Sequence, residues 1–309
     1  MKQPLHVSAE VARALAARRP VVALETTLVS HGLPHPEGLR AAAAIESEVR
    51  AGGAVPATIG VLDGRVRVGM SAADVERLAR GESVAKLNLS NLAAQLASGE
   101  PGCTTVAATL FVAHRVGIEV FATGGIGGVH RGDAFDVSAD LLALSRHPVA
   151  VVCSGAKAVL DLARTREALE SLGVPVLGFA TDEFPAFYSR HSGLAVDARL
   201  DSPADLAAAV AAHFSLGTGA GVVVANPIPT AEELPAELYE AAIAAALATA
   251  AARGIAGRDV TPFLLEELRV RTGGKSLVAN RALLVSNAAL AAQLAVALAA
   301  AGPAPSERA

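Results

Sequence analysis

Lysine is scarce in this chain, because only four of its 26 basic residues are lysines and the others are arginines. An amine can lose its proton where it is desolvated and then attack a carbonyl carbon, whereas a guanidinium stays charged at any accessible pH. Lys86 lies in the apolar run 84–87, and Lys157 follows an apolar segment and a Ser-Gly turn. Codon usage could also leave so few lysines, so their scarcity indicates where amine chemistry could occur without establishing it. No chemical role is expected for Lys2 and Lys275.

Other chemically useful side chains follow the expected strands. Glu25 comes directly after the apolar run 21–24, and the run 118–123 leads into a glycine-rich loop over 124–128, followed by His130. Ligands of an open α/β sheet gather at the carboxyl ends of the strands. A carboxylate, two amines, an imidazole and a glycine-rich loop are therefore expected on one rim of the sheet.

Each of these features also has a purely structural interpretation. Glu25 could cap a helix, Lys86 could extend its ammonium to water, and the glycines could form a tight turn packed on a helix. A dinucleotide or P-loop site is weakly indicated, because His130 breaks the G-x-G-x-x-G pattern and no Gly-Lys-Ser/Thr follows. The loop is expected to expose backbone N–H groups beside His130 and Arg131, which would suit a phosphate or another anion.

Three aspartates follow this loop, namely Asp133, Asp136 and Asp140. One of them could bind a hard metal ion such as Mg²⁺ or Mn²⁺ through its carboxylate. Alternatively, Asp136 or Ser138 caps a helix that is expected to begin near Ala139. The spacing of these residues does not separate the two interpretations.

Lys157 is expected close to the start of a helix that runs through Leu160 and Leu172. The positive end of a helix dipole disfavours an ammonium, and apolar neighbours or the cation of Lys86 would act in the same direction. An uncharged amine at this position is what imine formation with a sugar aldehyde requires.

The pattern of the whole chain predicts a single α/β domain over 1–309. Strand-like runs alternate with alanine-rich helical segments and give way to helices from about residue 231, so we expect αβα layers with a largely parallel central sheet and a helical C-terminal part. An N-terminal helix over 1–18 and a flexible tail over 302–309 are also expected. The predicted strands are 21–24, 58–62, 84–87, 118–123, 149–153, 174–179 and 221–225, with 65–68 as the hairpin partner of 58–62, and the predicted helix caps include Ser71, Ser90 and Ser202.

Composition argues against several classes of partner. The net charge is −4 and aromatic residues make up 3%, which is unlike a nucleic-acid-binding protein. The apolar segment 287–301 is expected to be too short and too rich in alanine to span a membrane, and the first residues lack the apolar core of a signal peptide, so a cytoplasmic protein is predicted. Cys103 and Cys153 have no zinc-type spacing and are expected in the core.

Eight motifs spread over the chain resemble one enzyme family. They include Ala-Leu-Glu-Thr-Thr at 23–27, Phe-Ala-Thr-Gly-Gly-Ile-Gly-Gly-Val-His-Arg-Gly at 121–132 and Val-Val-Cys-Ser-Gly-Ala-Lys at 151–157. Together they resemble the pseudouridine-5′-phosphate glycosidases, also called pseudouridylate synthases. This resemblance implies reversible cleavage of the C-glycosidic bond of pseudouridine 5′-phosphate to uracil and ribose 5-phosphate, through a ring-opened ribose bound to a lysine. The remaining motifs lie at 31–32, 53–59, 136–140, 223–229 and 261–265.

The resemblance also assigns roles to individual residues. It implies that Lys157 is the nucleophile, that Glu25 is the proton donor and that Asp136 binds one Mn²⁺ per subunit of a homo-oligomer, expected to be a trimer. The loop Asp133-Ala134 is shorter than is typical of the family, which affects the metal position. The substrate-binding positions implied are Lys86, Val106, Ser138, Ala139, Asp140, His130, Thr123 and Asn280, with the last against the base.

Two other functions stay open from the sequence. One is an imine-forming aldolase that acts on a different sugar phosphate. The other is a catalytically silent sensor that binds a nucleotide phosphate at the 124–128 loop.

Overall fold

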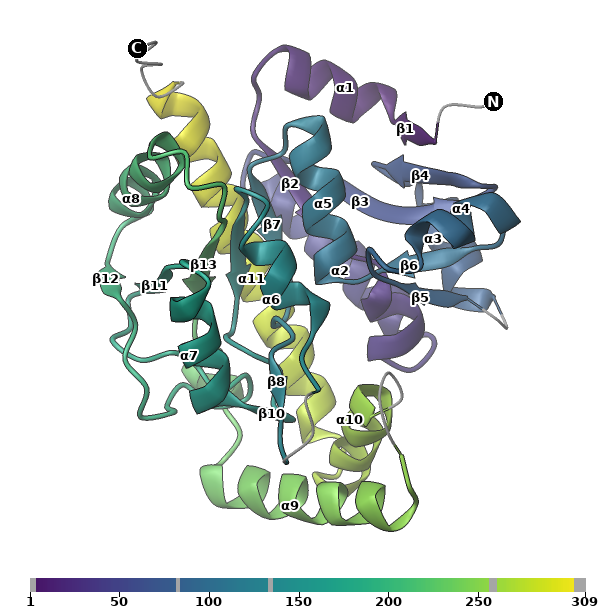
Figure 1. The fold of residues 1–309 in the computed structure, drawn as a ribbon, viewed down its shortest axis with the longest axis vertical. Helices are drawn as coiled ribbons and strands as arrows, with labels where there is room; N and C mark the ends of the chain where they lie inside the picture. Colours follow the sequence, from purple (N-terminus) through teal and green to yellow (C-terminus); the bar gives the residue numbers. More distant parts are fainter. Residues whose placement is uncertain (1–3, 82–83, 133–135, 256–259, 303–309) are drawn as a thin grey trace.

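The computed structural model describes residues 4–81, 84–132, 136–255 and 260–302, and its centre is an eleven-stranded sheet (Figure 1). The strands of the chain are β1 Leu5–Val7, β2 Val21–Leu24, β3 Val55–Leu62, β4 Arg65–Val68, β5 Ala85–Leu87, β6 Gly102–Thr104, β7 Val120–Ala122, β8 Val129–His130, β9 Ala150–Cys153, β10 Leu160–Asp161, β11 Val176–Phe179, β12 Ala198–Leu200 and β13 Val222–Ala225. The main order is β1-β4-β3-β2-β7-β9-β13-β11-β12, whereas β8 and β10 form a separate antiparallel pair.

The strands from β3 to β12 in this order run parallel, as the sequence predicted. Leu24 of β2 pairs with Ala122 of β7, Ala122 pairs with Val152 of β9, and Cys153 pairs with Ala225 of β13. The carboxyl ends of these four strands therefore lie level with one another. All four are buried along their length, as expected for parallel strands covered on both faces.

Helices cover both faces of the sheet, which confirms the αβα arrangement. Helix α5 contacts β2, β6 and β7 and packs on α6, whereas α11 contacts β2, β7 and β9 and packs on α2 and α8. Figure 1 shows α5 and α6 in front of the sheet and α11 behind it. The helices are α1 Ala9–Ala16, α2 Glu37–Ala51, α3 Ala72–Arg80, α4 Leu92–Ser98, α5 Val106–Val116, α6 Ala139–Leu144, α7 Leu162–Ser171, α8 Pro203–Ser215, α9 Ala236–Ala252, α10 Val260–Arg271 and α11 Lys275–Ala301, with a π-helix η1 Leu28–Gly32 and a 3₁₀-helix η2 Thr230–Glu232.

Two of the three predicted serine caps are confirmed. The hydroxyls of Ser71 and Ser202 accept hydrogen bonds from backbone N–H groups in the first turns of α3 and α8. The prediction for Ser90 was wrong, because Asn91 precedes α4. The Ser90 hydroxyl instead donates to Oδ1 of Asn88 at 2.7 Å, so the local turn uses it before the helix begins.

The ends of the chain differ from the sequence prediction. The expected helix over 1–18 is in fact strand β1 followed by α1, because residues 5–7 pair in parallel with the outer edge of β4. Ser8 then starts α1, and its hydroxyl accepts a hydrogen bond from the Val11 N–H at 3.3 Å. The predicted tail lies outside the described residues from 303 onward, and α11 ends at Ala301.

Helix α11 is longer than the segment considered for membrane insertion. It has 27 residues and, by length and composition, is the one helix in the described part of the chain that could cross a bilayer. Half of its most apolar window is buried inside the protein, because the helix packs against β2, β7 and β9. Its apolar character is therefore explained by its place behind the sheet.

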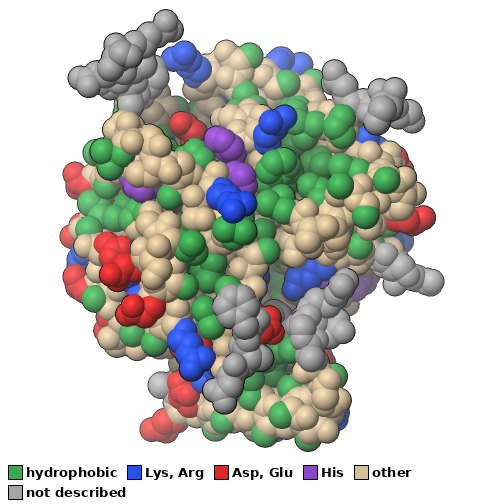
Figure 2. All heavy atoms as spheres, in the orientation of Figure 1, with side chains coloured by type: hydrophobic (Ala, Val, Ile, Leu, Met, Phe, Trp, Pro, Cys, Tyr) green, Lys and Arg blue, Asp and Glu red, His purple; other side chains and the backbone are tan. Residues whose placement is uncertain are grey.

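The distribution of basic side chains on the surface and the burial of the two cysteines agree with the expectations from composition. On the face drawn in Figure 2, the described basic side chains lie apart from one another instead of forming a continuous stripe. Cys103 and Cys153 are fully buried, which confirms that both belong to the core. Burial raises the pKa of the Cys103 thiol to about 11 and that of the Cys153 thiol to about 12.

Candidate active site

Polar residues stand in a row at the carboxyl edge of the central strands. Glu25, Thr123, Ser154 and Asn226 follow β2, β7, β9 and β13 directly, and the register of these strands sets them level. The predicted convergence of strand-end residues is therefore observed for the central strands. Lys86 reaches the site differently, because β5 pairs with β6 at the side of the sheet, and β6 pairs with β3.

The Glu25 carboxylate is buried and held at both oxygens. The Thr123 hydroxyl donates to Oε1 at 2.5 Å, and the Thr27 hydroxyl donates to Oε2. Only 8% of the residue is exposed, so the carboxylate is oriented by neighbours on β7 and on its own loop. Thr123, predicted to contact substrate, thus has an observed contact with the candidate proton donor.

Lys157 is positioned by a turn that only glycine can form. Gly155 has φ +78°, and a Cβ at this position would lie 1.9 Å from the backbone oxygen of Pro185. The segment then pairs with the glycine-rich loop, because the Lys157 N–H donates to the Ile126 carbonyl at 2.9 Å. At the residue after Lys157, the Ala158 carbonyl accepts a hydrogen bond from the Tyr239 hydroxyl of α9 at 2.5 Å. The backbone on both sides of the lysine is therefore fixed.

The expected helix start at Lys157 was wrong. The chain is extended at β10, because Leu160 and Asp161 pair with β8, and α7 begins only at Leu162. Asp161 caps this helix by accepting a hydrogen bond from the Arg164 N–H at 3.0 Å. The positive end of the α7 dipole therefore lies at Asp161. The lysine is not at the start of a helix, so the expected effect of a helix dipole on its amine does not apply.

Two cavities meet at the lysines. The central cavity, of about 70 Å³, is lined by Glu25, Lys86, Thr123, Lys157 and Asn280, together with His31 and Phe187 among others. A second cavity of about 290 Å³, here called the Asp136 cavity, is lined by Lys86, Lys157, His130 and the segment 136–140, among others. Both lysines border both cavities, so one molecule lying in the two spaces would pass beside them.

His31 is a site residue that the sequence reasoning did not assign. It lies in η1 and lines the central cavity, and its Nε2 is 3.0 Å from the Val84 carbonyl oxygen. Burial and the nearby charge of Lys86 lower the pKa of His31. We assign the proton of the neutral ring to Nε2, because it faces a carbonyl acceptor, which leaves Nδ1 as an acceptor. The motif His31-Gly32 was the available signal in the sequence.

The glycine-rich loop is a packing junction, and the expectation that it is exposed was wrong. Residues 124–128 are buried, and the N–H groups of Ile126 and Gly127 donate to the Gly155 carbonyl and the Asp140 carboxylate. A Cβ on Gly125 would lie 2.7 Å from the Phe187 ring. The glycines let side chains from other segments approach the loop, while Gly124 and Gly125 line the central cavity and Gly127 lines the Asp136 cavity.

Asp140 ties three elements together. Its Oδ1 accepts a hydrogen bond from Ala107 N–H at the start of α5 at 2.9 Å, and its Oδ2 accepts one from Gly127 at 2.8 Å. Ser138 caps α6 by accepting a hydrogen bond from the Asp140 N–H at 3.2 Å. Ser138, Ala139 and Asp140 all line the Asp136 cavity, whereas Val106 is fully buried and the neighbouring Thr105 lines it instead.

Asp136 offers one carboxylate to this cavity. Its Oδ2 lies 3.9 Å from Nδ1 of His130, and 42% of its side chain is exposed. Among the described residues, no group of three or more His, Cys, Asp or Glu side chains is placed to hold a metal. A metal that takes most of its ligands from water and phosphate, as Mg²⁺ does, fits such a site better than zinc. Asp133 and Ala134 lie outside the described residues.

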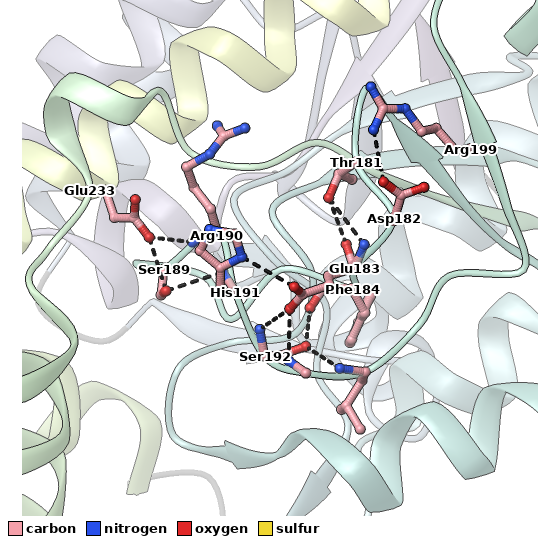
Figure 3. A network of polar contacts seen from close by, with 12 residues as sticks. Thr181, Asp182, Glu183, Phe184, Ser189, Arg190, His191, Ser192, Arg199 and Glu233 are labelled. Carbon is pink, nitrogen blue, oxygen red and sulfur yellow. Dashed lines mark hydrogen bonds and ion pairs between the residues drawn. The ribbon is translucent and has the colours of Figure 1, made fainter.

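Phe187 reaches the central cavity from the long connection between β11 and β12, which a polar network holds (Figure 3). The Glu183 carboxylate accepts hydrogen bonds from the N–H groups of Ser192 and Gly193 at 2.9 and 2.7 Å, and lies 3.2 Å from Nδ1 of His191. These hydrogen bonds lower the pKa of Glu183, with that from Gly193 the largest contribution. The network fixes the loop that presents the aromatic ring.

Asn287 of α11 is a second residue that the sequence reasoning missed. It is fully buried, and its Nδ2 donates to the Thr123 carbonyl at 2.8 Å and contacts the Ser154 hydroxyl at 3.2 Å. Its Oδ1 accepts a hydrogen bond from Asn226 Nδ2 at 2.9 Å. One amide thus connects the ends of β7, β9 and β13 behind the site. Its position in a long alanine-rich helix gave no local signal.

Replacing Asn287 by leucine is expected to lower the free energy of unfolding by roughly 3 kcal/mol, because it leaves the buried Thr123 carbonyl and Ser154 hydroxyl without a partner and removes one of the two hydrogen bonds of Asn226. Urea denaturation followed by circular dichroism measures this change. The control is Ser286→Ala, which removes only a 3.1 Å hydrogen bond from Asn226 and leaves that amide bound to Asn287. Equal stability of the two variants would contradict the role given to Asn287.

The fold and site define an α/β enzyme that has a fixed lysine and a buried glutamate beside a double cavity. The chain belongs to the indigoidine synthase A-like family, whose model matches residues 10–297. It is 55% identical to the pseudouridine-5′-phosphate glycosidase of Methylobacterium nodulans over 95% of this chain and 88% of that protein. It is 52% identical to the enzyme of that name from Paracoccus denitrificans, over 95% and 98% of the two chains. The resemblance found in the motifs is therefore confirmed.

Solved structures agree with this assignment. A prealnumycin C-glycosynthase crystallised with ribulose 5-phosphate superposes with a TM-score of 0.90 at 41% identity, over 97% of this chain and 99% of that one. An indigoidine synthase A-like protein from Thermotoga maritima gives a TM-score of 0.87 at 36% identity, over 96% of each chain. These structures share the α/β fold described above.

Proposed function

We propose that this enzyme catalyses the reversible cleavage of pseudouridine 5′-phosphate to uracil and ribose 5-phosphate. The observation that carries the proposal is that Lys157 and Glu25 line one cavity, while Lys157 and Lys86 also border a second cavity large enough for a sugar phosphate. The two relatives that are 55% and 52% identical over the aligned residues carry the name of this activity.

The chemistry requires an amine because the bond to be broken joins two carbons. A C-glycoside has no leaving heteroatom to protonate, so a pair of carboxylates alone does not suffice. In the cleavage direction, the Lys157 amine bonds to C1′ as the C1′–O4′ bond breaks, and the proton that the nitrogen loses balances the one that O4′ gains as it becomes a hydroxyl. The nitrogen lone pair then forms the imine as the C1′–C5 bond breaks. The electron pair of that bond goes to C5 of uracil, which takes a proton from Glu25. Water hydrolyses the imine and releases ribose 5-phosphate.

The two cavities suit the two halves of this substrate. The sugar phosphate would lie in the Asp136 cavity, beside the cation of Lys86 and the ring of His130. The base would lie in the central cavity, with Asn280 at the end remote from that phosphate. The ribose C1′ would then lie between them, where Lys157 borders both spaces.

We further propose one Mn²⁺ per subunit, held by the Asp136 carboxylate with water and substrate oxygen. When bound, the ion would supply positive charge that helps to hold the anionic substrate. His130, 3.9 Å from this carboxylate, would orient it. A cytoplasmic homo-oligomer, expected to be a trimer, completes the proposal, and light scattering after size-exclusion chromatography measures the subunit number.

Uracil release from pseudouridine 5′-phosphate, followed by absorbance after chromatography, tests the function. We expect release that falls when the metal is removed with EDTA and returns with Mn²⁺. Absence of uracil release in the presence of Mn²⁺ would overturn the proposal. Uracil-independent consumption of ribose 5-phosphate would favour an aldolase, and thermal stabilisation by substrate without turnover would favour a sensor.

A further inference from the structure

A third cavity continues the site beyond the central one. This outer cavity, of about 220 Å³, lies between η1 and the helices α10 and α11, where its lining includes His31, Arg269, Ser276 and Asn280. It shares His31 and Asn280 with the central cavity, but neither Lys157 nor Glu25 lines it. The three spaces therefore follow one another, with the Asp136 cavity at one end and the outer cavity at the other.

The outer cavity has polar groups that are available to a ligand. Ser276 and Asn280 lie one turn apart on α11 and are 2% and 8% exposed. Within the described part of the chain, neither the Ser276 hydroxyl nor the Asn280 amide makes a hydrogen bond. Neither side chain is among the buried polar atoms that lack a partner in the described residues, so the polar atoms of both are accessible from the cavity. Their presence on one wall indicates a surface that meets ligand or water.

The shape of uracil fixes what would face this cavity. In pseudouridine 5′-phosphate the sugar is attached at C5 of the ring, and C2 lies opposite C5 with N1 and N3 on either side of it. If C5 is beside Lys157 and the ring extends toward Asn280, then N1, C2 and N3 face the outer cavity. A group on either nitrogen would therefore extend away from the reacting bond and not into the protein core.

We propose that the outer cavity receives substituents on N1 or N3 of the pyrimidine, so that the enzyme accepts N-alkylated C-nucleoside 5′-phosphates. This inference rests on the proposed function. The cavity is several times the about 30 Å³ that one water molecule occupies in the liquid, so it has room for a short alkyl chain. The ion pair of Arg269 with Glu266, 2.6 Å long, lies on the wall contributed by α10.

The test compares kcat/KM for pseudouridine 5′-phosphate with that for its N1-methyl and N1-propyl derivatives. We expect the N1-propyl substrate to stay within about tenfold of the parent, because a pocket that rejected the chain would discriminate by far more. A loss of about 100-fold or more for both derivatives would overturn the inference while the function stands. No cleavage of the parent substrate would instead refute the proposed function.

Two variants locate the effect. Ser276→Leu and Arg269→Trp each add bulk to the outer cavity, and each should lower the ratio of N1-propyl to parent kcat/KM by about tenfold or more. Arg269 has a side chain that is 39% exposed, so its variant should fold even if the buried Ser276 site does not tolerate leucine. Val278→Leu changes a residue of α11 that is 64% exposed and outside the cavity, and should leave the ratio unchanged. An unchanged ratio in both filled variants would contradict the proposal.

Discussion

Uracil release is expected to fall by about 10⁴-fold or more when Lys157 is replaced by arginine, because a guanidinium cannot lose its proton and form an imine. The replacement keeps a long nitrogen-bearing side chain beside the two cavities, so loss of side-chain bulk cannot explain the result. Backbone contacts on both sides of the residue, from Ile126 and from the Tyr239 hydroxyl, should keep the local fold intact. Initial rates with pseudouridine 5′-phosphate measure the effect.

Covalent trapping of the sugar on Lys157 is a second measurement that tests whether this residue forms the imine. Borohydride reduction in the presence of ribose 5-phosphate should add the mass of the reduced sugar to a peptide that contains Lys157. Lys275→Arg is the matched control, because Lys275 starts α11 and lines none of the three cavities described above. That variant should keep both its rate and its trapped peptide. An unmodified Lys157 in an enzyme that turns over would refute the imine.

The second large effect is expected for Glu25→Gln, which should lower uracil release by about 10² to 10⁴-fold, because an amide cannot deliver the proton that C5 of uracil requires. The side chain keeps its size and one oxygen acceptor for the Thr123 or Thr27 hydroxyl. Glu76→Gln is the control, since Glu76 is an exposed partner of Arg80 on α3 and lines none of the three cavities. Rates of the two variants are measured under the same conditions.

The two predictions separate the roles of the amine and the carboxylate. Ribose 5-phosphate alone needs no proton on uracil, so Glu25→Gln should still be labelled at Lys157 by borohydride, whereas Lys157→Arg should not. A Glu25 variant that cleaves pseudouridine 5′-phosphate at the parent rate would show that Glu25 takes no part in the reaction. A variant that neither cleaves nor traps would show that Glu25 also acts in imine formation.

Much of the fold was available from local patterns. The parallel strands read as short apolar runs, and the polar residues that follow β2 and β9, Glu25 and Lys157, were identified because strand ends of an open sheet form one rim. Ser71 and Ser202 marked helix starts through their own side chains. These signals depend on residues that are neighbours in the sequence, so they can be recognised without knowledge of the tertiary structure.

Other features depend on partners that are far away in the sequence. The start of α7 was misplaced because Leu160 pairs with His130, and the glycine-rich loop was judged exposed because Phe187 and Ser138, which cover it, come from later segments. Asn287 is 164 residues from Thr123, whose carbonyl it binds. No local pattern marks such a contact, since its energy comes from burial of polar groups that only the folded chain brings together.

The sequence alone determined the fold class and the family, and it indicated Lys157 and Glu25 as candidate site residues, because those depend on residue types, motifs and strand ends. The tertiary structure decided how the pair is held and what surrounds it. It placed Lys86 on the side strand β5, brought His31 from η1 to the central cavity, and formed the outer cavity from η1, α10 and α11. A cavity is the space left between packed elements, so it exists only when segments distant in sequence have taken their final positions.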